Sequence, residues 1–116
     1  MKSTVSLKEN HLFRRLYKKG RTAADGRLAL YVRPNGQKTN RLGLTVSTKL
    51  GHAVVRNRTR RRLREIYRIH EKQLVQGTDM VIVARVRAAH SSFRELEQSY
   101  LRLAEKLNLL RKGETT

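Results

Sequence analysis

The segment from His52 to His70 contains seven arginines and one acid, and it still keeps an apolar side at helical spacing. At 3.6 residues per turn, Val55, Thr59, Leu63 and Ile66 share one face. Polar residues occupy the rest: Asn57, Arg61, Arg64 and Arg68 form a stripe opposite, Arg56 and Arg60 flank it, and Arg58 and Arg62 lie nearer the apolar side. We therefore predict a helix at 52–70 that packs on a core with one side and presents guanidinium groups on the other.

The excess of positive charge extends over the whole chain, since 27 Lys and Arg against 9 Asp and Glu give a formal net charge of +18. Such a charge opposes compaction by self-repulsion and favours a polyanionic partner. Nucleic acid fits best, because Lys and Arg release counterions from phosphates and guanidinium groups bind phosphate through paired hydrogen bonds. A membrane surface would require large exposed apolar residues on a basic helix. A merely solvated basic face is the remaining alternative.

Several protein classes are excluded by what the sequence lacks. Without cysteine there is no disulfide scaffold and no Cys-ligated zinc or iron–sulfur site. No run of 18 apolar residues could span a membrane, and Lys8 and Glu9 interrupt any signal-peptide core. We expect a cytoplasmic protein with a single domain at 1–116 and an ordered core at about 7–110.

Hydrophobic periodicity predicts six elements in the order α-β-β-α-β-α, an α+β sandwich. They are a helix at 7–19, strands at 27–33 and 41–47, a helix at 52–70, a strand at 79–86 and a helix at 91–110. Pro34-Asn35-Gly36 favours a turn, so the first two strands are expected to pair as an antiparallel hairpin. The strand at 79–86 is apolar on both faces, which indicates a central position.

Helix starts are indicated by two capping-box patterns. Ser92 and Glu95 fit the pattern before the last helix. Ser6 and Glu9 fit it before the first, although Asn10 is a competing start.

Three aromatic residues are candidates for a nucleic-acid groove. Phe13 and Tyr17 are four residues apart on one helix face, and Tyr31 lies on the less apolar side of its strand. If the helix leans on that side of the sheet, the three rings line a groove that can stack unpaired bases. The alternative is that Phe13 and Tyr17 are ordinary core residues.

No constellation for protein-based catalysis is present. The histidines are scattered at His11, His52, His70 and His90, and the only close acids, Glu95 and Glu97, point to different sides of their helix. A nuclease would need convergent carboxylates for metal ions or a positioned base. The sequence therefore predicts a partner of RNA without catalytic residues of its own.

Three segments together resemble the protein subunit of bacterial ribonuclease P. They are Phe13-Arg14-Arg15-Leu16-Tyr17-Lys18-Lys19-Gly20, Arg41-Leu42-Gly43-Leu44-Thr45-Val46-Ser47, and the block from Lys49 to Arg58 with its Arg56-Asn57-Arg58 triplet. The resemblance covers roughly residues 7–110. It implies a fold like the second domain of ribosomal protein S5, with a left-handed βαβ crossover that general preference would not choose.

The resemblance also implies a function and site residues. The family's ribonucleoprotein removes the 5′ leader of precursor tRNA, and its RNA subunit is catalytic. By matching position, the resemblance implies that the residues facing that RNA are Lys49, Arg56, Asn57, Arg58, Arg61, Arg64 and Arg68. We add the flanking Arg60 to this set. It likewise implies a leader-binding cleft lined by Phe13, Tyr17, Tyr31, Thr45 and Ser47. His52 and Thr48 depart from the residues usual in the family, and His52 is the weaker N-cap.

Magnesium is expected in the holoenzyme, bound largely by RNA, and no metal position is assigned to the protein. The expected partners are the ribonuclease P RNA and precursor tRNA, without membrane or homo-oligomer. Two alternatives stay open: a ribosomal or RNA-chaperone binding protein without a processing role, and a DNA-binding architectural protein with a steep salt dependence.

Overall fold

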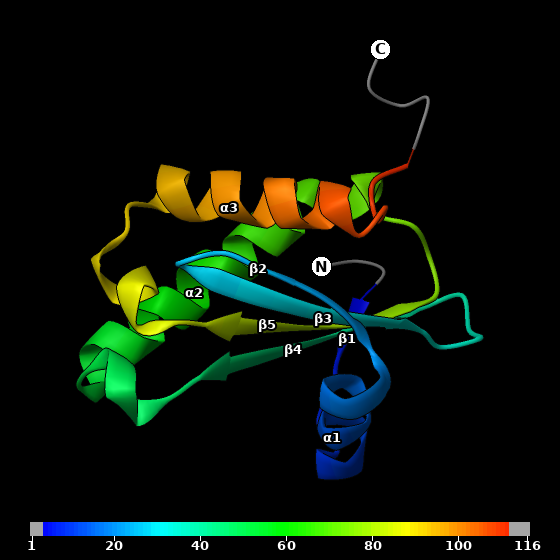
Figure 1. The fold of residues 1–116 in the computed structure, drawn as a ribbon, viewed down its shortest axis with the longest axis horizontal. Coiled ribbons are helices and arrows are strands. Elements are labelled where there is room, and N and C mark those ends of the chain that lie inside the picture. Colours follow the sequence, from blue (N-terminus) through cyan, green and yellow to red (C-terminus); the bar gives the residue numbers. More distant parts are fainter. Residues whose placement is uncertain (1–3, 112–116) are drawn as a thin grey trace.

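A computed structural model describes residues 4–111 of the chain. Within this range the protein forms one five-stranded sheet and three α-helices (Figure 1). The strands are β1 (Thr4–Ser6), β2 (Arg21–Ala24), β3 (Leu28–Pro34), β4 (Asn40–Val46) and β5 (Thr78–Ala84), in the spatial order β1-β4-β5-β3-β2. The helices are α1 (Asn10–Lys19), α2 (Ala53–His70) and α3 (Phe93–Lys106), with 3-10 turns η1 (Thr48–Leu50), η2 (Glu71–Gln73) and η3 (Val86–His90).

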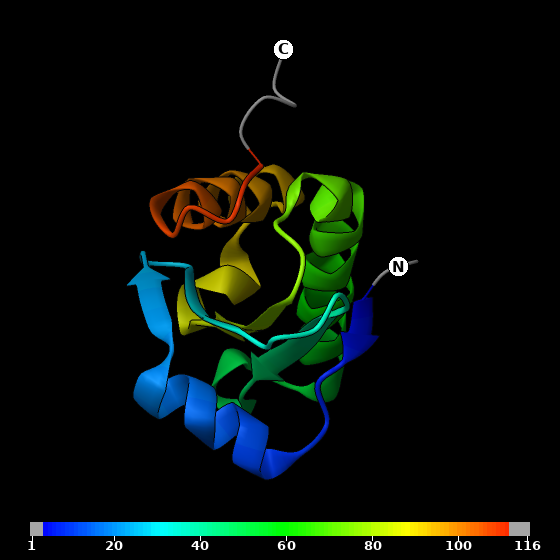
Figure 2. The same cartoon turned by 90° about the vertical axis from the view of Figure 1, so that its right-hand side faces the viewer.

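The sheet separates two helical layers: α2 and α3 cover one face and α1 lies on the other (Figures 1 and 2). Because side chains alternate along a strand, Ile82 and its neighbours Leu30 and Leu44 face the main core under α2 and α3. Val81 belongs to the opposite face, where it forms a smaller core with Leu7 and Leu16. The α1 side is therefore the thinner layer of the fold.

The predicted hairpin between the first two strands is wrong. Strand β5 lies between them, antiparallel to β3 and parallel to β4. Val81 and Ile82 are both fully buried, so the strand is covered on both faces, and β3 and β4 occupy its two edges. The turn at Asn35 instead packs against the start of β5, where the Asn35 N–H donates to the Gly77 carbonyl at 2.8 Å. The expected central position of this strand is confirmed.

Helix α2 connects β4 to β5 by a left-handed crossover. In Figure 2 the two parallel strands run away from the viewer, with β4 to the right of β5 and α2 above them. The path from β4 through α2 to β5 thus turns anticlockwise as it recedes. This is the hand that the family resemblance implied, against the general preference.

The sequence analysis did not predict two short strands. One of them, β1, occupies residues near the predicted start of the first helix, which therefore begins later. Residues 4–6 form β1, which pairs in parallel with β4, and residues 21–24 form β2 beside β3. Because Ser6 belongs to β1, it caps no helix; α1 begins at Asn10 after Glu9, whose side chain makes no capping bond. The predicted start at 7 and the Ser6–Glu9 capping box are therefore wrong, and the competing start at Asn10 is confirmed.

The last helix is shorter than predicted, although its capping box is confirmed. The Ser92 hydroxyl accepts the Glu95 N–H at 3.1 Å, and the Glu95 carboxylate accepts the Ser92 N–H at 2.8 Å. The helix ends at Lys106, and Asn108 adopts φ +56°. The chain then turns back, so that Leu109 is buried outside the helix and its carbonyl accepts the Val75 N–H at 2.8 Å.

Candidate nucleic-acid interface

Helix α2 has the two sides that the arginine-rich segment predicts. Thr59, Leu63, Ile66 and Tyr67 are buried against the main core. The Thr59 hydroxyl donates to the Val55 carbonyl at 3.0 Å, which satisfies its polar group inside the layer. The outward face carries the exposed side chains of the predicted stripe, Asn57, Arg61, Arg64 and Arg68, with Arg56 and Arg60 half-buried along its edge. Arg58, which the periodicity places nearer the apolar side, is exposed as well.

The outward arginines are mostly unneutralised by the protein itself. Arg58, Arg61 and Arg64 make no hydrogen bond or ion pair with any other side chain in 4–111. Arg68 is the exception: its guanidinium donates to both Glu65 carboxylate oxygens, at 2.9 and 2.5 Å, and this contact lowers the pKa of Glu65. Arg60 donates to the Asn57 side-chain oxygen at 3.1 Å, which leaves its positive charge uncompensated.

Arg62 differs from the other arginines of the helix. Like Arg56 and Arg60 it is half-buried, but its guanidinium donates to a backbone carbonyl of another segment, that of Ser91, at 3.0 Å. This bond ties α2 to the segment between η3 and α3. Arg62 therefore holds the layer together and adds little to the outward face.

Lys49 is brought to the N-terminal end of the arginine face by the turn η1. The Ser47 hydroxyl accepts the Lys49 N–H at 3.3 Å, and Gly51 takes φ +139° before α2 begins. Lys49 itself is exposed. His52 is the N-cap of α2 without a side-chain bond, as expected for a weak capping residue.

The three aromatic residues meet on the opposite face of the sheet, between α1 and the strands. The rings of Tyr17 and Tyr31 lie edge to face with centroids 5.0 Å apart, and Phe13 and Tyr17 are 6.5 Å apart. The Tyr17 hydroxyl is 2.8 Å from the Thr45 hydroxyl, which fixes the ring over β4. Tyr17 is 41% exposed, so part of its ring remains open to a ligand.

A glycine allows this close approach of α1. A Cβ at Gly43 would lie only 2.6 Å from Cζ of Phe13, so the ring occupies the space of the missing side chain. Beside it, the register aligns Thr45 with Val83 and Val83 with Ala29, which gives a floor of small side chains next to the rings. We call Phe13, Tyr17, Tyr31 and this floor the aromatic cleft.

The structure brings four of the five predicted cleft residues together. Phe13, Tyr17, Tyr31 and Thr45 are linked by the two ring contacts and the hydroxyl contact. Ser47 is exposed two residues beyond Thr45, and its hydroxyl is used as the cap of η1. Val83 and Ala29 escaped sequence reasoning because an apolar strand looks like plain core; only the pairing register shows that they lie beside Thr45.

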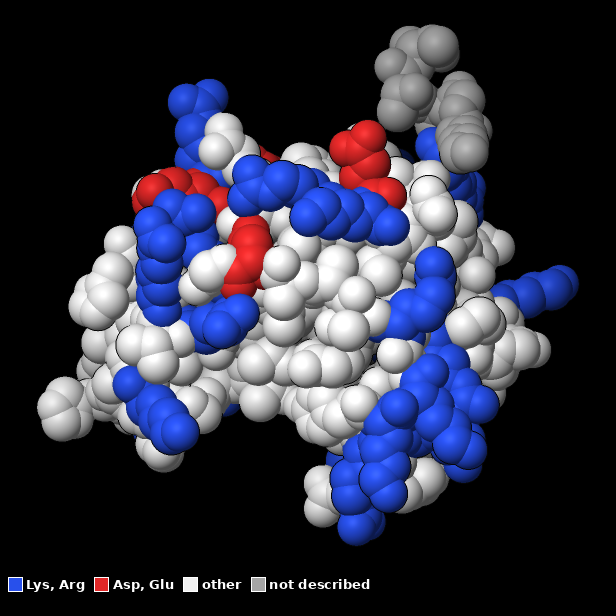
Figure 3. All heavy atoms as spheres, in the orientation of Figure 1, with Lys and Arg blue, Asp and Glu red and all other residues white. Residues whose placement is uncertain are grey.

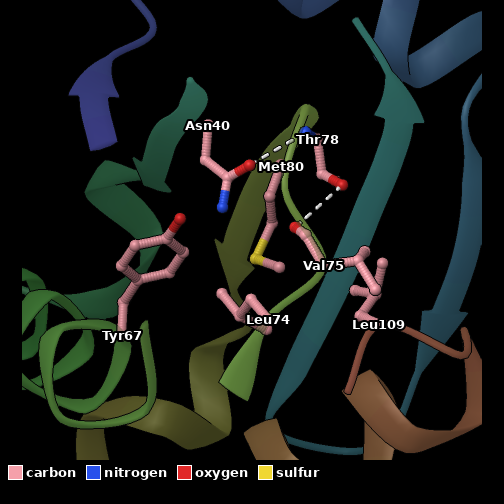
Figure 4. Close-up of a pocket in the computed structure, with 7 residues that line it drawn as sticks. All are labelled: Asn40, Tyr67, Leu74, Val75, Thr78, Met80 and Leu109. Carbon is pink, nitrogen blue, oxygen red and sulfur yellow. Dashed lines mark hydrogen bonds between the residues drawn. The ribbon is translucent and has the colours of Figure 1, made fainter. Parts of the chain in front are cut away.

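A small pocket lies at the end of the main core, lined by residues of neither surface (Figure 4). It is lined by Asn40, Tyr67, Leu74, Val75, Thr78, Met80 and Leu109. Its polar groups already have partners: the Asn40 side-chain oxygen accepts the Thr78 N–H at 3.0 Å, the Tyr67 hydroxyl is 2.9 Å from the Thr4 hydroxyl, and the Thr78 hydroxyl donates to the Val75 carbonyl at 3.4 Å. The pocket therefore offers little to a ligand. In residues 4–111 no group of three His, Cys, Asp or Glu could hold a metal ion, and no helix is long and apolar enough to cross a membrane.

Comparison with known proteins identifies the protein family. A family model described as Ribonuclease P matches residues 1–108. The chain belongs to the ribonuclease P protein family. The ribonuclease P protein component of Alkaliphilus oremlandii is 40% identical over 110 residues, covering 95% of this chain and 96% of that protein. The component from Natranaerobius thermophilus is 38% identical, covering 97% and 98%.

Solved structures of ribonuclease P proteins share the fold. The Staphylococcus aureus protein superposes with a TM-score of 0.84 at 30% identity, covering 91% of this chain and 97% of that one. The Thermotoga maritima protein gives 0.76 at 27% identity, covering 84% and 92%. The chain is thus an RNA-binding protein subunit of the endoribonuclease ribonuclease P and acts in tRNA processing, with the ribonuclease P RNA as partner. The ribosomal and DNA-binding alternatives are set aside.

Proposed function

We propose that the arginine face of α2 docks the protein on the catalytic RNA, while the aromatic cleft holds the 5′ leader of precursor tRNA. The docking set is Lys49, Arg56, Asn57, Arg58, Arg60, Arg61, Arg64 and Arg68. The observation that supports it is the sidedness of α2: its inner residues are buried, and Arg58, Arg61 and Arg64 are exposed without a partner in the described chain.

Arginine is suited to this docking role. Its planar guanidinium binds phosphate oxygens through two parallel hydrogen bonds and stacks on bases, whereas lysine acts as a point charge. Because an α-helix rises 1.5 Å per residue, the outward stripe from Asn57 to Arg68 extends along about 16 Å of the helix. Phosphate binding of this kind releases counterions, so docking is expected to weaken steeply with salt.

Asn57 supports the arginines in a different way. Its side-chain oxygen accepts a hydrogen bond from Arg60 at 3.1 Å, which holds that guanidinium toward the outward face. An asparagine carries no charge to offset the arginine it positions. The contact therefore orders Arg60 while leaving its positive charge for the RNA.

The cleft offers bases a surface to stack on without selecting a sequence. Aromatic rings stack on any unpaired base, at about 1–3 kcal/mol per base. Phe13, Tyr17 and Tyr31 are held in place by one another and by the Thr45 hydroxyl. A leader bound here adds affinity for precursor tRNA over mature tRNA, because only the precursor carries this strand.

Hydrolysis is assigned to the RNA subunit. The described residues contain no cluster of metal ligands, and the protein is assigned no metal ion. Magnesium is bound largely by RNA in this proposal. The protein works in the bacterial cytoplasm as a single domain, without forming a homo-oligomer.

The docking role is tested by reversing three outward charges. The triple variant Arg61→Glu, Arg64→Glu, Arg68→Glu should abolish assembly with a bacterial ribonuclease P RNA at physiological salt and thereby abolish leader removal at low magnesium. The matched control reverses three exposed cations elsewhere, Lys38→Glu, Arg94→Glu and Lys106→Glu, and should retain assembly. Cleavage that survives the α2 variant would show that docking does not use this face.

A further inference from the structure

A second group of cations covers the outer side of α1. Arg14, Arg15, Lys18 and Lys19 are all exposed, and none of their side chains makes a hydrogen bond or ion pair with another residue in the described chain. Figure 3 shows Lys and Arg side chains gathered over α1 at the lower right of the molecule. We call these four residues the α1 cationic surface.

The stability of helix α1 does not explain why these four cations are present. Arg14 with Lys18, and Arg15 with Lys19, are like-charged pairs four residues apart, which repel on a helix. No acid occurs between Glu9 and Asp25 to relieve them. The helix dipole favours cations only in the last turn, which accounts for the two lysines and leaves the arginines unexplained.

Beside α3, on the other side of the sheet, two arginines are paired with acids. Arg102 pairs with Asp25 at 3.0 Å, and Arg27 pairs with Glu95 at 2.9 Å. Figure 3 accordingly shows acidic and basic side chains interspersed over α3. The α1 cationic surface is thus a region of uncompensated charge that an external anion can neutralise.

The surface adjoins the aromatic cleft. At 100° per residue, Arg14 and Lys18 lie on the flank of α1 beside the side that carries Phe13 and Tyr17. Because α1 and α2 cover opposite faces of the sheet, this surface is separate from the arginine face of α2 (Figures 1 and 2). A strand that leaves the cleft across α1 meets these cations first.

We propose that the α1 cationic surface binds phosphates of the 5′ leader beyond the nucleotides held in the cleft. This inference rests on the proposed function, since it extends the path of the same strand. A helix with its side chains is about 10–12 Å across. At the per-strand spacing of about 3.4 Å, about three or four nucleotides cover that width.

The test compares two leader lengths in the holoenzyme. The variant Arg14→Ala, Arg15→Ala, Lys18→Ala, Lys19→Ala is assembled with a ribonuclease P RNA, and its Kd is measured for precursor tRNA with a leader of about four or about ten nucleotides. We expect at least about tenfold weaker binding of the long-leader substrate, with a salt slope lower by up to about 3. Binding of the short-leader substrate should stay unchanged.

A matched variant controls for net charge and folding. Lys38→Ala, Lys72→Ala, Arg94→Ala and Lys106→Ala remove the same charge from exposed positions elsewhere, and circular dichroism checks that both variants fold. Equal losses for both leaders, no loss for either, or the same loss in the control variant would each overturn the inference. If the wild-type holoenzyme itself does not prefer precursor over mature tRNA, the proposed function fails and the inference fails with it.

Discussion

Gly43 determines how closely α1 can approach the sheet. The Phe13 ring fills the space above this glycine, and a Cβ there would lie 2.6 and 2.7 Å from two ring carbons. The aromatic cleft therefore depends on a residue that has no side chain of its own. Its contribution is steric: it lets the ring pack against the strand.

Gly43→Ala is expected to push the Phe13 ring out of place. Overpacking of this kind lowers the free energy of unfolding by about 1–3 kcal/mol, which urea denaturation measures. Precursor binding should weaken at the same time. Gly26→Ala is the control, because a Cβ there would meet only the flexible end of Arg87, at 3.1 Å; equal stability of the two variants would contradict the packing role.

Tyr17 combines a stacking face with a hydrogen bond to Thr45. Tyr17→Ala removes the stacking face and should weaken precursor binding about ten- to a hundredfold, while Tyr17→Phe keeps the ring and should stay within about threefold. The readout is the Kd for precursor against mature tRNA. An equal loss for both RNAs would mean that the ring does not contact the leader.

Among the elements, the turn between β2 and β3 is tied to α3 by the Asp25 carboxylate, in addition to the Arg27–Glu95 ion pair. Burial alone would raise the pKa of Asp25, but hydrogen bonds from the Leu28 and Arg27 N–H groups, with help from Arg102, lower this pKa to about 2. The Arg102 guanidinium donates to the second oxygen at 3.0 Å. Asp25 thus joins a strand turn to a helix far along the chain.

Asp25→Asn should lower the free energy of unfolding by about 1–2 kcal/mol at neutral pH. Since the pKa of Asp25 in the fold lies below its ordinary value of 3.8, the carboxylate stabilises the protein above about pH 4. This contribution is lost as the pH falls toward about 2, so the free energies of unfolding of the variant and the wild type should become equal there. Urea denaturation against pH checks this; Glu105→Gln, at an exposed acid without a side-chain partner in the described chain, should show no such convergence.

Helix α2 and the centre of the sheet could be predicted, whereas the strand pairing could not. The spacing of Thr59, Leu63 and Ile66 is sufficient to define a buried side, and the apolar run around Val81 indicates a central strand. Pro34-Asn35-Gly36 does form a turn, but local turn chemistry does not tell which strand comes next to β3. That choice depends on β5, which lies far later in the chain, beyond α2.

The candidate site likewise has one part that could be predicted from the sequence and one part that could not. The outward arginines follow from helical periodicity within one element. The cleft depends on contacts between distant segments, such as Tyr17 with Thr45 and Phe13 with Gly43. Residue types suggested an aromatic groove, but its floor of Ala29 and Val83 needed the pairing register.

For the whole molecule, the net charge of +18 is distributed over both sides of the sheet. The arginine face of α2 and the α1 cationic surface lie in opposite layers (Figure 2). Repulsion among these groups opposes the folded state, and anions bound to them relieve it. The stability of the free protein should therefore depend on which anions are present.

Sulfate or phosphate is expected to raise the Tm of the free protein by about 4 °C or more, the shift that about 1 kcal/mol produces in a domain of this size. Thermal unfolding followed by circular dichroism measures it, with chloride at equal ionic strength as reference. Sulfate also stabilises proteins through general exclusion. The Arg61→Glu, Arg64→Glu, Arg68→Glu variant should therefore gain less than the wild type, and an equal gain would contradict specific anion binding.

The position of β5 in the sheet also determines how late in translation the sheet can form. Among the described strands, the last to be synthesised is the one around which the others are arranged. A nascent chain that ends before Thr78 can pair β2 with β3 and β1 with β4, but the two pairs have no strand in common. They join into one sheet only when β5 is inserted between β3 and β4. Most of the chain must therefore be translated before the sheet closes, and its two halves become stable together.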